Sequence, residues 1–344
     1  MNEGWRRALI ERGARVESAQ ATGFDPVQPP GKGQTALTAL LSHGVLHASG
    51  QDAKAFLQGQ LSNDVELISE SRAEPAAYCT PKGRVLATPL LWWADEGYAL
   101  GLPRELCEAI RRRLQMYVLR SRVQLAEASD RIALIGVAGP EARTIVSAEL
   151  GLELSSVIDV AHGDAVTALA LPGLRVLVIA ESAQAVEVWD RLAHRCTVTA
   201  EEVWEARAIA AGIPTVTAAT QDHFTPHMLN LDLIGAVSFD KGCYTGQEIV
   251  ARTQYLGQVK RRLARFAAAS SAKPGEAIHA ETAIAGTVVN AARAATDRFE
   301  LLAVTQTPQH NLANALQLGT GGAALEPLDL PYRVPLAESA DAGD

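Results

Sequence analysis

Residues 240–252 read Asp-Lys-Gly-Cys-Tyr-Thr-Gly-Gln-Glu-Ile-Val-Ala-Arg, the part of the 344-residue chain richest in reactive and turn-forming residues. Cys243 follows Lys241 by two positions and precedes a predicted helix that starts near Gly246. A nearby cation and a helix N-terminus both favour a thiolate over a thiol. Gly242 and Gly246 permit a tight turn and the close approach of a ligand. We therefore predict that Cys243 is a nucleophile, a redox thiol or a cluster ligand, against the competing interpretation of a buried cysteine in a turn.

The residues after Cys243 have two competing interpretations. Gln247 and Glu248 lie in the first turn of the predicted helix, where the helix dipole stabilises a carboxylate. Arg252 follows Glu248 by four residues, so an ion pair on the helix surface is also available. A direct contact with a ligand is the alternative for all three.

The composition describes a folded chain without an obvious metal or membrane signal. Apolar residues make up 48% and charged residues 20%, which is enough to bury a large core and to build two to three domains. The net charge of −8 argues against a chain-wide electrostatic contact with nucleic acid but allows a local basic patch. The four cysteines show no zinc-type spacing. No secretory signal and no apolar run of about 20 residues is evident, so we expect a cytoplasmic protein.

Alternating strand-like and helix-like segments predict an α+β fold. Pro/Gly-rich stretches and changes of periodicity set the expected boundaries. The expected parts are an N-terminal helix and linker (1–34), a mixed α+β domain (35–130, completed by residues of about 200–255), a ferredoxin-like α+β domain (131–199), a β-rich domain with the pattern of a small β-barrel or a sandwich (256–335) and a disordered tail (336–344).

Other polar and aromatic segments are candidates for ligand contacts. Gln60, Asn63 and Asp64 follow an apolar stretch, and amides suit the edge of a heterocycle, although such residues also form turns and caps. Lys82-Gly83-Arg84 is a turn with two cations, a weak signal alone. Trp204 lies on a predicted helix, where an indole is more often a core residue than a stacking partner.

Together these segments resemble the YgfZ-type folate-binding family, relatives of the T-protein (aminomethyltransferase) of the glycine cleavage system. The most specific match is Lys-Gly-Cys-Tyr-Thr-Gly-Gln-Glu at 241–248. The other matching segments follow in the family's order and span about residues 44–332: Gln58-Gly59-Gln60, Asn63-Asp64-Val65, Lys82-Gly83-Arg84, Arg207, Ala211-Gly212-Ile213-Pro214, Pro226, Asn230-Leu231, Leu325-Glu326-Pro327 and Pro331-Tyr332. The resemblance implies a T-protein-like ring of three domains, with a C-terminal β-barrel, around a pocket for tetrahydrofolate or a one-carbon derivative.

The resemblance also implies roles for individual residues. Cys243 inherits the functional role, with a possible part as ligand of a labile cluster and with no other metal site. The residues implied to act with it or to shape its loop are Lys241, Gly242, Tyr244, Gly246, Gln247, Glu248 and Arg252. The residues implied to bind the cofactor are Trp204, His43, Gln60, Asn63, Asp64 and Arg207, where His43 stands at a position that is tryptophan in some relatives.

Family members support iron–sulfur cluster assembly or repair and iron–sulfur-dependent tRNA modification. The resemblance therefore implies folate, iron–sulfur client enzymes such as tRNA methylthiolation enzymes, and an indirect contact with tRNA as partners, and no membrane. The alternative is a tetrahydrofolate-dependent aminomethyltransferase or demethylase of small amines. The T-protein branch uses an aspartate just after the turn at 82–84, whereas residues 85–93 here contain no acid, so we expect little such activity. A third interpretation is a folate-stabilised binding module whose Arg111–Arg113 run faces a partner or its tRNA.

Overall fold

The computed structural model describes residues 2–17, 20–24, 33–306 and 316–335. The expected disordered tail at 336–344 and part of the expected linker at 25–32 lie outside these residues. The N-terminal segment forms α1 (Glu3–Glu11) and a hairpin of β1 (Ala14–Glu17) and β2 (Gln20–Phe24). The Asn2 side chain caps α1 by accepting hydrogen bonds from two backbone N–H groups.

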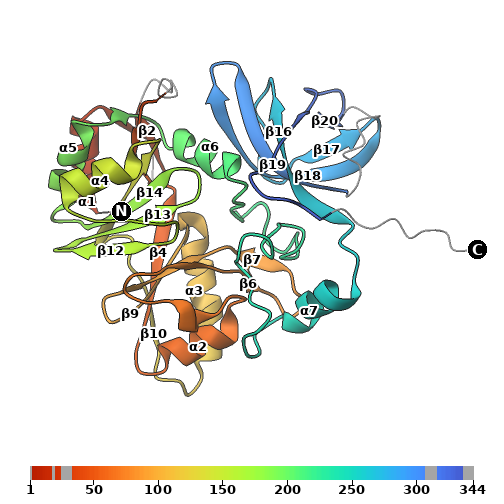
Figure 1. The fold of residues 1–344 in the computed structure, drawn as a ribbon, viewed down its shortest axis with the longest axis horizontal. Helices are drawn as coiled ribbons and strands as arrows, with labels where there is room; N and C mark the ends of the chain where they lie inside the picture. Colours follow the sequence, from red (N-terminus) through yellow and green to blue (C-terminus); the bar gives the residue numbers. More distant parts are fainter. Residues whose placement is uncertain (1, 18–19, 25–32, 307–315, 336–344) are drawn as a thin grey trace, which may run out of the picture.

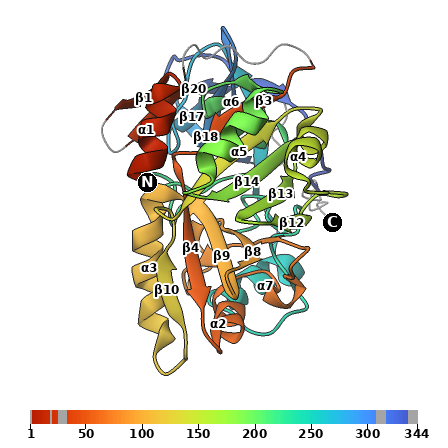
Figure 2. The same cartoon turned by 90° about the vertical axis from the view of Figure 1, so that its left-hand side faces the viewer.

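The first sheet is antiparallel and forms the lower half of the molecule in Figures 1 and 2. Its five described strands lie in the spatial order β10 (Gln124–Glu127), β4 (His43–Ser49), β9 (Gly97–Pro103), β8 (Leu90–Ala94) and β5 (Glu74–Pro75). The accompanying short elements are α2 (Ala53–Gln60), the 3-10 turn η1 (Val65–Leu67) and the hairpin of β6 (Tyr78–Cys79) and β7 (Val85–Ala87).

The helix α3 (Arg104–Val118) covers one face of this sheet. Its buried side chains Leu106, Ile110 and Leu114 recur every three or four residues and therefore lie on one side of the helix. Pro103 precedes the first turn, where a missing N–H costs nothing.

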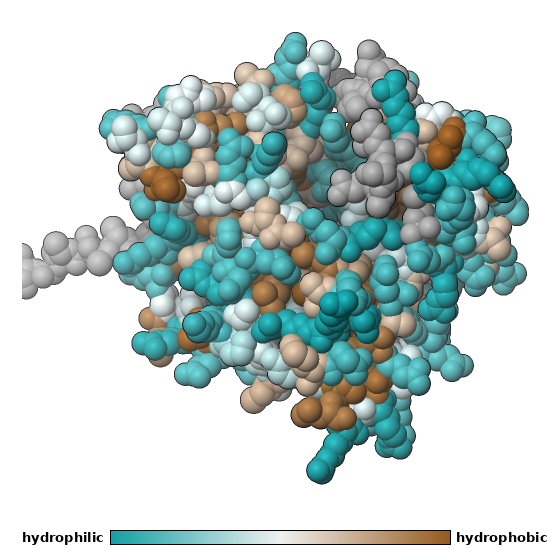
Figure 3. All heavy atoms as spheres, turned by 180° about the vertical axis from the view of Figure 1, so that it is seen from behind, coloured by the Kyte–Doolittle hydropathy of each residue, from teal (hydrophilic) through white to brown (hydrophobic). Residues whose placement is uncertain are grey.

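Figure 3, the view from behind, shows a mostly hydrophilic surface with apolar side chains gathered near the lower end of the molecule.

The second sheet is mixed and is buried on both faces. Its six described strands lie in the order β12 (Val160–Gly163), β13 (Val166–Leu171), β14 (Arg175–Glu181), β11 (Ile132–Ala138), β3 (Ala36–Ala39) and β15 (Thr197–Val198). One face packs under α1, α4 (Ala142–Leu150) and α5 (Ala185–Ala193), and the other faces the first sheet. The side chains of β14 alternate between the two faces. Val176 and Val178 pack against the helices, whereas Leu177 and Ile179 pack in the core that faces the first sheet.

Residues 36–39, which we expected in the first domain, belong to this second sheet. They form β3, which is antiparallel to β11 and parallel to β15. The chain therefore contributes a strand to the second sheet before it builds the first.

The third sheet is curled but open. Its six described strands follow the order β20 (Leu316–Leu318), β17 (Ala277–Ala280), β18 (Ala283–Ala295), β19 (Arg298–Gln306), β16 (Arg261–Ala268) and β21 (Glu326–Leu328). Register shifts in β18 help to bend the long strands around one another, as Figure 1 shows. Within the described residues, the two short edge strands do not pair with each other, so the expected barrel is a half-barrel.

A long irregular segment joins the three sheets. It runs from the end of α6 (Glu202–Ala210) to the start of α7 (Gln247–Leu256). Phe224, Leu229 and Leu231 from this segment are buried in a core shared with β6, β7 and the third sheet. No helix in the described part of the chain is long and apolar enough to cross a membrane.

Candidate functional site

A central cavity of ≈ 440 Å³ lies where the first two sheets meet the irregular segment. Its wall is mostly apolar. Residues that contribute to it from different elements include His43, Trp92, Arg175, Trp204, Pro214 and Ala236. A wider hollow of ≈ 900 Å³ lies between β8 and β12–β14, but none of the residues proposed from the sequence lines it.

An indole and a guanidinium dominate one wall of the central cavity. Trp204 is 2% exposed and packs on Gly136, where an added Cβ would come within 2.7 Å of the ring. The guanidinium carbon of Arg175 lies 4.6 Å from the centre of this ring, and its Nε donates to the carbonyl of Pro172 at 3.0 Å. Burial lowers the pKa of Arg175 to about 10, although the charge of Glu205 opposes this shift.

Arg175 is a buried cation without a full set of partners. Its exposed fraction is 6%. Among the residues that the structure describes, its two Nη groups have no hydrogen-bond acceptor, and no carboxylate oxygen lies within 4.0 Å. A buried charge is costly unless it is paired, so this guanidinium is suited to an anionic or carbonyl-bearing ligand.

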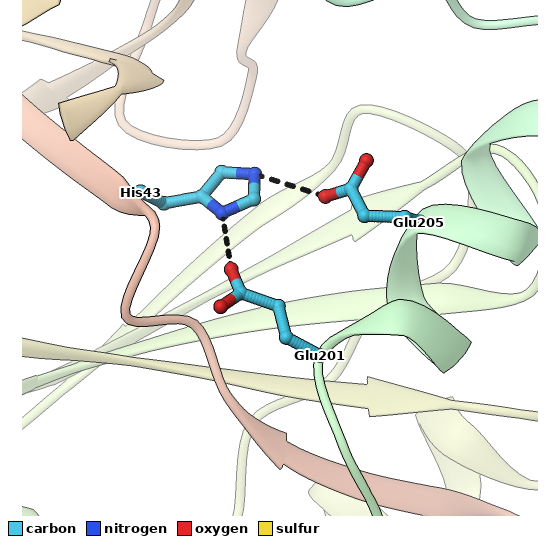
Figure 4. A group of neighbouring side chains, drawn as sticks. All are labelled: His43, Glu201 and Glu205. Carbon is cyan, nitrogen blue, oxygen red and sulfur yellow. Dashed lines mark hydrogen bonds and ion pairs between the residues drawn. The ribbon is translucent and has the colours of Figure 1, made fainter. Parts of the chain in front are cut away.

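His43 lies between two carboxylates at the cavity wall (Figure 4). Its Nδ1 is 2.8 Å from Oε1 of Glu201, and its Nε2 is 3.5 Å from Oε1 of Glu205. Burial of the ring disfavours its charged form, but the hydrogen bond to Glu201 and the charges of both carboxylates raise the pKa of His43 overall. Burial raises the pKa of Glu205, and the pairing with His43 outweighs burial to lower the pKa of Glu201. The cluster thus favours an imidazolium held between the two acids.

The same cluster has the residue types of a metal site, but its bonding fits an ion pair better. The ligand atoms of His43, Glu201 and Glu205 lie within 4.8 Å of one another. Glu201 already accepts hydrogen bonds from the backbone N–H groups of Leu41 and Ser42. A metal needs a neutral imidazole, whereas these carboxylates favour the protonated ring.

Lys241 lies beneath the loop that carries Cys243. Its Nζ donates to three backbone carbonyls, those of Gln58 at 2.7 Å, Leu61 at 2.7 Å and Asn63 at 2.8 Å. These carbonyls lie at and just after the end of α2, where helical carbonyls lack internal partners. Burial lowers the pKa of Lys241 to about 8. Lys241 therefore attaches the loop to the end of α2, and its three donors are all used on backbone carbonyls.

The loop itself is held by Gly246 and presents Cys243 to solvent. Gly246 has φ +89°, and an added Cβ would lie 2.5 Å from the carbonyl oxygen of Thr80, whereas Gly242 has no atom within 4 Å of such a position. Cys243 is exposed. Burial raises the pKa of the Tyr244 hydroxyl, which lies below the loop surface.

The residues that follow the loop lie at the start of α7. The backbone N–H of Tyr244 donates to Oε1 of Gln247 at 3.3 Å. Glu248 and Arg252 are exposed, and no ion pair joins them within the described chain. Their side chains are available to solvent.

The remaining proposed cofactor residues lie outside the cavity lining. The Asn63 amide donates to Oε2 of Glu74 at 2.9 Å and to the carbonyls of Pro75 at 2.8 Å and Gly235 at 2.9 Å, and all three of these residues line the cavity. Asp64 caps η1. Oε1 of Gln60 is buried without a partner in the described structure, and Arg207 is half-buried on α6. Of the proposed set, Trp204 and His43 line the cavity, and Asn63 supports its wall.

Sequence reasoning missed Arg175, Glu201 and Glu205. Arg175 is the first residue of the largely apolar strand β14, and a charged residue next to such a run could have marked it as a candidate site residue. Glu201 and Glu205 are four residues apart on either side of Trp204, the spacing of neighbours on a helix surface.

Comparisons with known proteins give relatives over most of the chain. The chain is 32% identical over 257 residues to the tRNA-modifying protein YgfZ of Klebsiella pneumoniae, covering 74% of this chain and 78% of that protein. It is 33% identical over 258 residues to the tRNA-modifying protein YgfZ of Escherichia fergusonii, with the same coverage of 74% and 78%. No protein-family model matches the chain.

A solved structure shares the fold. The glycine cleavage system aminomethyltransferase T of Bartonella henselae superposes with a TM-score of 0.77, covering 96% of this chain and 97% of that one, at 14% identity. At that identity the likeness shows a mixed α/β, T-protein-like fold and nothing about the reaction.

Proposed function

Because the chain belongs to the YgfZ family of tRNA-modifying proteins, we propose that it supports tRNA modification by binding a folate and presenting a reactive thiol. The folate is tetrahydrofolate or a one-carbon derivative in the central cavity. The thiol is that of Cys243, acting on iron–sulfur client enzymes such as those that methylthiolate tRNA. We also propose that the three sheets correspond to the three domains of a ring around this cavity.

The observation that carries the folate proposal is the wall formed by Trp204 and Arg175. The cavity volume of ≈ 440 Å³ falls within the range of about 300–1,000 Å³ typical of small-molecule sites. The indole contributes apolar surface to the wall, and the guanidinium that lies over its ring offers donors to a carbonyl or carboxylate. His43 also lines the cavity, but its charge is paired with Glu201 and Glu205, so Arg175 is the cation left for a ligand. The apolar remainder excludes water, and the bound folate would supply the carrier of a one-carbon unit.

Cys243 is suited to chemistry with another macromolecule because it is exposed and lies outside the cavity lining. An exposed thiol can bridge a labile cluster or form a mixed disulfide with a client. The other cysteines are poorer candidates, since burial raises the pKa of Cys79 and of Cys107 to about 12 and that of Cys196 to about 11.

Asn63 connects the two places. Its side-chain amide holds Glu74 and Gly235 of the cavity wall, and its backbone carbonyl accepts a hydrogen bond from Lys241 below the Cys243 loop. A ligand that orders Glu74 and Gly235 in the cavity wall would therefore also order Asn63, whose carbonyl holds Lys241 and the Cys243 loop. This contact gives folate a physical route by which to affect the thiol.

The alternative, aminomethyl transfer to tetrahydrofolate, rests on the T-protein-like fold alone. Residues 85–94 contain no carboxylate to hold or move a proton from an amine. Turnover of an aminomethyl donor with tetrahydrofolate would favour this alternative over the accessory role.

The first test is calorimetric titration of tetrahydrofolate into the purified full chain. We expect saturable binding to the wild type and at least about tenfold weaker binding to Trp204→Ala, because the substitution removes apolar wall and the ring on which Arg175 lies. Trp93→Ala, which changes an indole outside the central cavity, should bind like the wild type. Equal affinities for Trp204→Ala and wild type, or no binding at all, would contradict the folate site.

The second test is complementation of cells that lack the wild-type protein. Cys243→Ser should fail to restore activity of an iron–sulfur-dependent tRNA methylthiolation enzyme, although the folded protein still binds tetrahydrofolate. Cys196→Ser should complement fully. Full complementation by Cys243→Ser would remove the thiol from the proposal.

A further inference from the structure

A second hollow, of ≈ 490 Å³, lies beside the Cys243 loop and away from the folate cavity. It lies between the β6–β7 turn, the irregular segment and the third sheet. The residues that give it its chemical character are Lys82, Arg84, His223, Phe224, Met228 and Arg261.

Three cations surround this hollow. Lys82 and Arg261 are exposed, and within the described residues neither is within 4.0 Å of a carboxylate. Arg84 donates through Nη1 to the backbone carbonyl of His223 at 2.7 Å, which fixes its direction without neutralising it. Asp222 is the single acid among the lining residues. In a chain with a net charge of −8, such a local excess of positive charge is a departure from the average surface.

An exposed ring also lines the hollow. It is the imidazole of His223, which meets the buried ring of Phe224 edge-on with centroids 6.0 Å apart. Met228 lines the same hollow. Cations beside an exposed ring are the combination that binds single-stranded nucleic acid, because the cations contact the phosphates while a base or ribose packs on the ring.

The hollow and the thiol loop share one hairpin turn. Gly83, between Lys82 and Arg84, lies against Gly246: an added Cβ on Gly246 would come within 3.2 Å of the Gly83 Cα. An added Cβ on Gly83 would come within 3.0 Å of Ile249 at the start of α7. A nucleic-acid strand bound in the hollow would therefore lie next to the loop that presents Cys243.

We propose that this hollow binds the phosphodiester backbone of a single-stranded RNA segment, such as a loop or an end of tRNA. The inference deepens the proposed role in tRNA modification, on which it rests, by replacing an indirect tRNA contact with a direct one at Lys82, Arg84 and Arg261. An acidic protein surface is the other partner that three cations could attract, but a flat protein patch would make little use of a hollow of ≈ 490 Å³ that the His223 ring lines.

The test is fluorescence anisotropy with a labelled, unmodified tRNA transcript and the full-length chain at several salt concentrations. Lys82→Glu/Arg261→Glu should weaken binding at least tenfold at about 100 mM salt, and Lys82→Ala/Arg261→Ala should lower the salt slope by about two. The matched control is Arg131→Glu/Arg191→Glu, which changes two exposed cations beside the second sheet and should bind like the wild type; like Lys82 and Arg261, neither is within 4.0 Å of a carboxylate in the described residues.

Three results would overturn the inference. One is unchanged tRNA binding by both hollow variants, and such variants that nevertheless lose a client enzyme in a pull-down would favour a protein partner. A second is an equal loss in the Arg131→Glu/Arg191→Glu control, which would indicate non-specific attraction. The third is the absence of tRNA binding by the wild type. Tetrahydrofolate titration of the same samples separates these failures from a failure of the proposed folate site, and it also shows that the variants are folded.

Discussion

Lys241 and Arg175 are both buried cations, but they use their donors in opposite ways. Lys241 donates to three backbone carbonyls and binds the Cys243 loop to the end of α2. Arg175 donates to one carbonyl, lies over an indole and keeps its remaining donors toward the central cavity. A fully satisfied buried charge builds the structure, whereas one that lacks acceptors is available for a ligand. The contrast separates a supporting region of the molecule from the proposed binding region.

The largest expected effect is the loss of stability in Lys241→Met. The substitution removes the donor from three buried carbonyls, each of which costs about 1–3 kcal/mol when left unpaired, so we expect the free energy of unfolding to fall by at least about 3 kcal/mol. Urea unfolding followed by circular dichroism measures it. The exposed Lys260→Met should change it by less than about 0.5 kcal/mol. A Lys241→Met protein as stable as the wild type would contradict the structural role of Lys241, and with it the difference between the two cations.

The seat of the loop provides the next comparison. Gly246→Ala should lower the free energy of unfolding by about 2–4 kcal/mol, because it combines a left-handed backbone with a contact against the carbonyl of Thr80. Gly242→Ala, four residues earlier in the same loop, meets no atom within 4 Å and should be near neutral. Thermal unfolding of both variants would show whether the packing of the Cys243 loop depends on the close approach of Gly246 to Thr80. Equal stabilities of the two variants would mean that it does not.

Arg175→Gln should affect binding and leave stability largely intact. Loss of a charged donor weakens tetrahydrofolate binding by about 10- to 100-fold. The free energy of unfolding should not fall, since the substitution also removes an incompletely paired buried charge. Calorimetry and urea unfolding on the same protein test both parts, with the exposed Arg191→Gln as control. Destabilisation without weaker binding would place Arg175 in the same class as Lys241.

The smallest effect concerns pH. The pKa of His43 is raised in the folded state, so the folded protein holds this proton more tightly than the unfolded chain does. Its pairing with Glu201 therefore contributes fully below about pH 6.5, the value for an unperturbed histidine, and is lost as the pH rises through the raised pKa. The difference in free energy of unfolding between wild type and His43→Gln should shrink across that window. A difference that is flat or grows with pH would contradict the ion pair.

Local features of the fold could be predicted from the sequence because their causes are local. The spacing of Leu106, Ile110 and Leu114 predicts the helix that α3 forms, and the turn glycines predict the tight approach at Gly246. Closure of the third sheet could not be predicted in the same way, since it depends on whether two distant edge strands meet. The pairing of residues 36–39 with the second sheet likewise depends on contacts far along the chain.

The candidate site shows the same division. Trp204 and His43 came from resemblance, and both line the cavity. The partners of Lys241 lie 178–183 residues away and are backbone atoms, which carry no sequence signal of their own. Glu201 meets His43 across 158 residues, so its role became visible only when the fold placed the two side by side.

The order in which the cavity wall is assembled has a consequence for synthesis on the ribosome. Lining residues extend along the chain from Leu40 to Ala236, and the second sheet takes its strand β3 from before the first sheet and β15 from just ahead of α6. At about 5–20 residues per second, translation to residue 236 takes roughly 10–50 s. Until then the emerging chain has no closed cavity, so the proposed vitamin-derived ligand could not stabilise it. Prematurely terminated chains that stop before this point would be left without that protection and open to proteolysis.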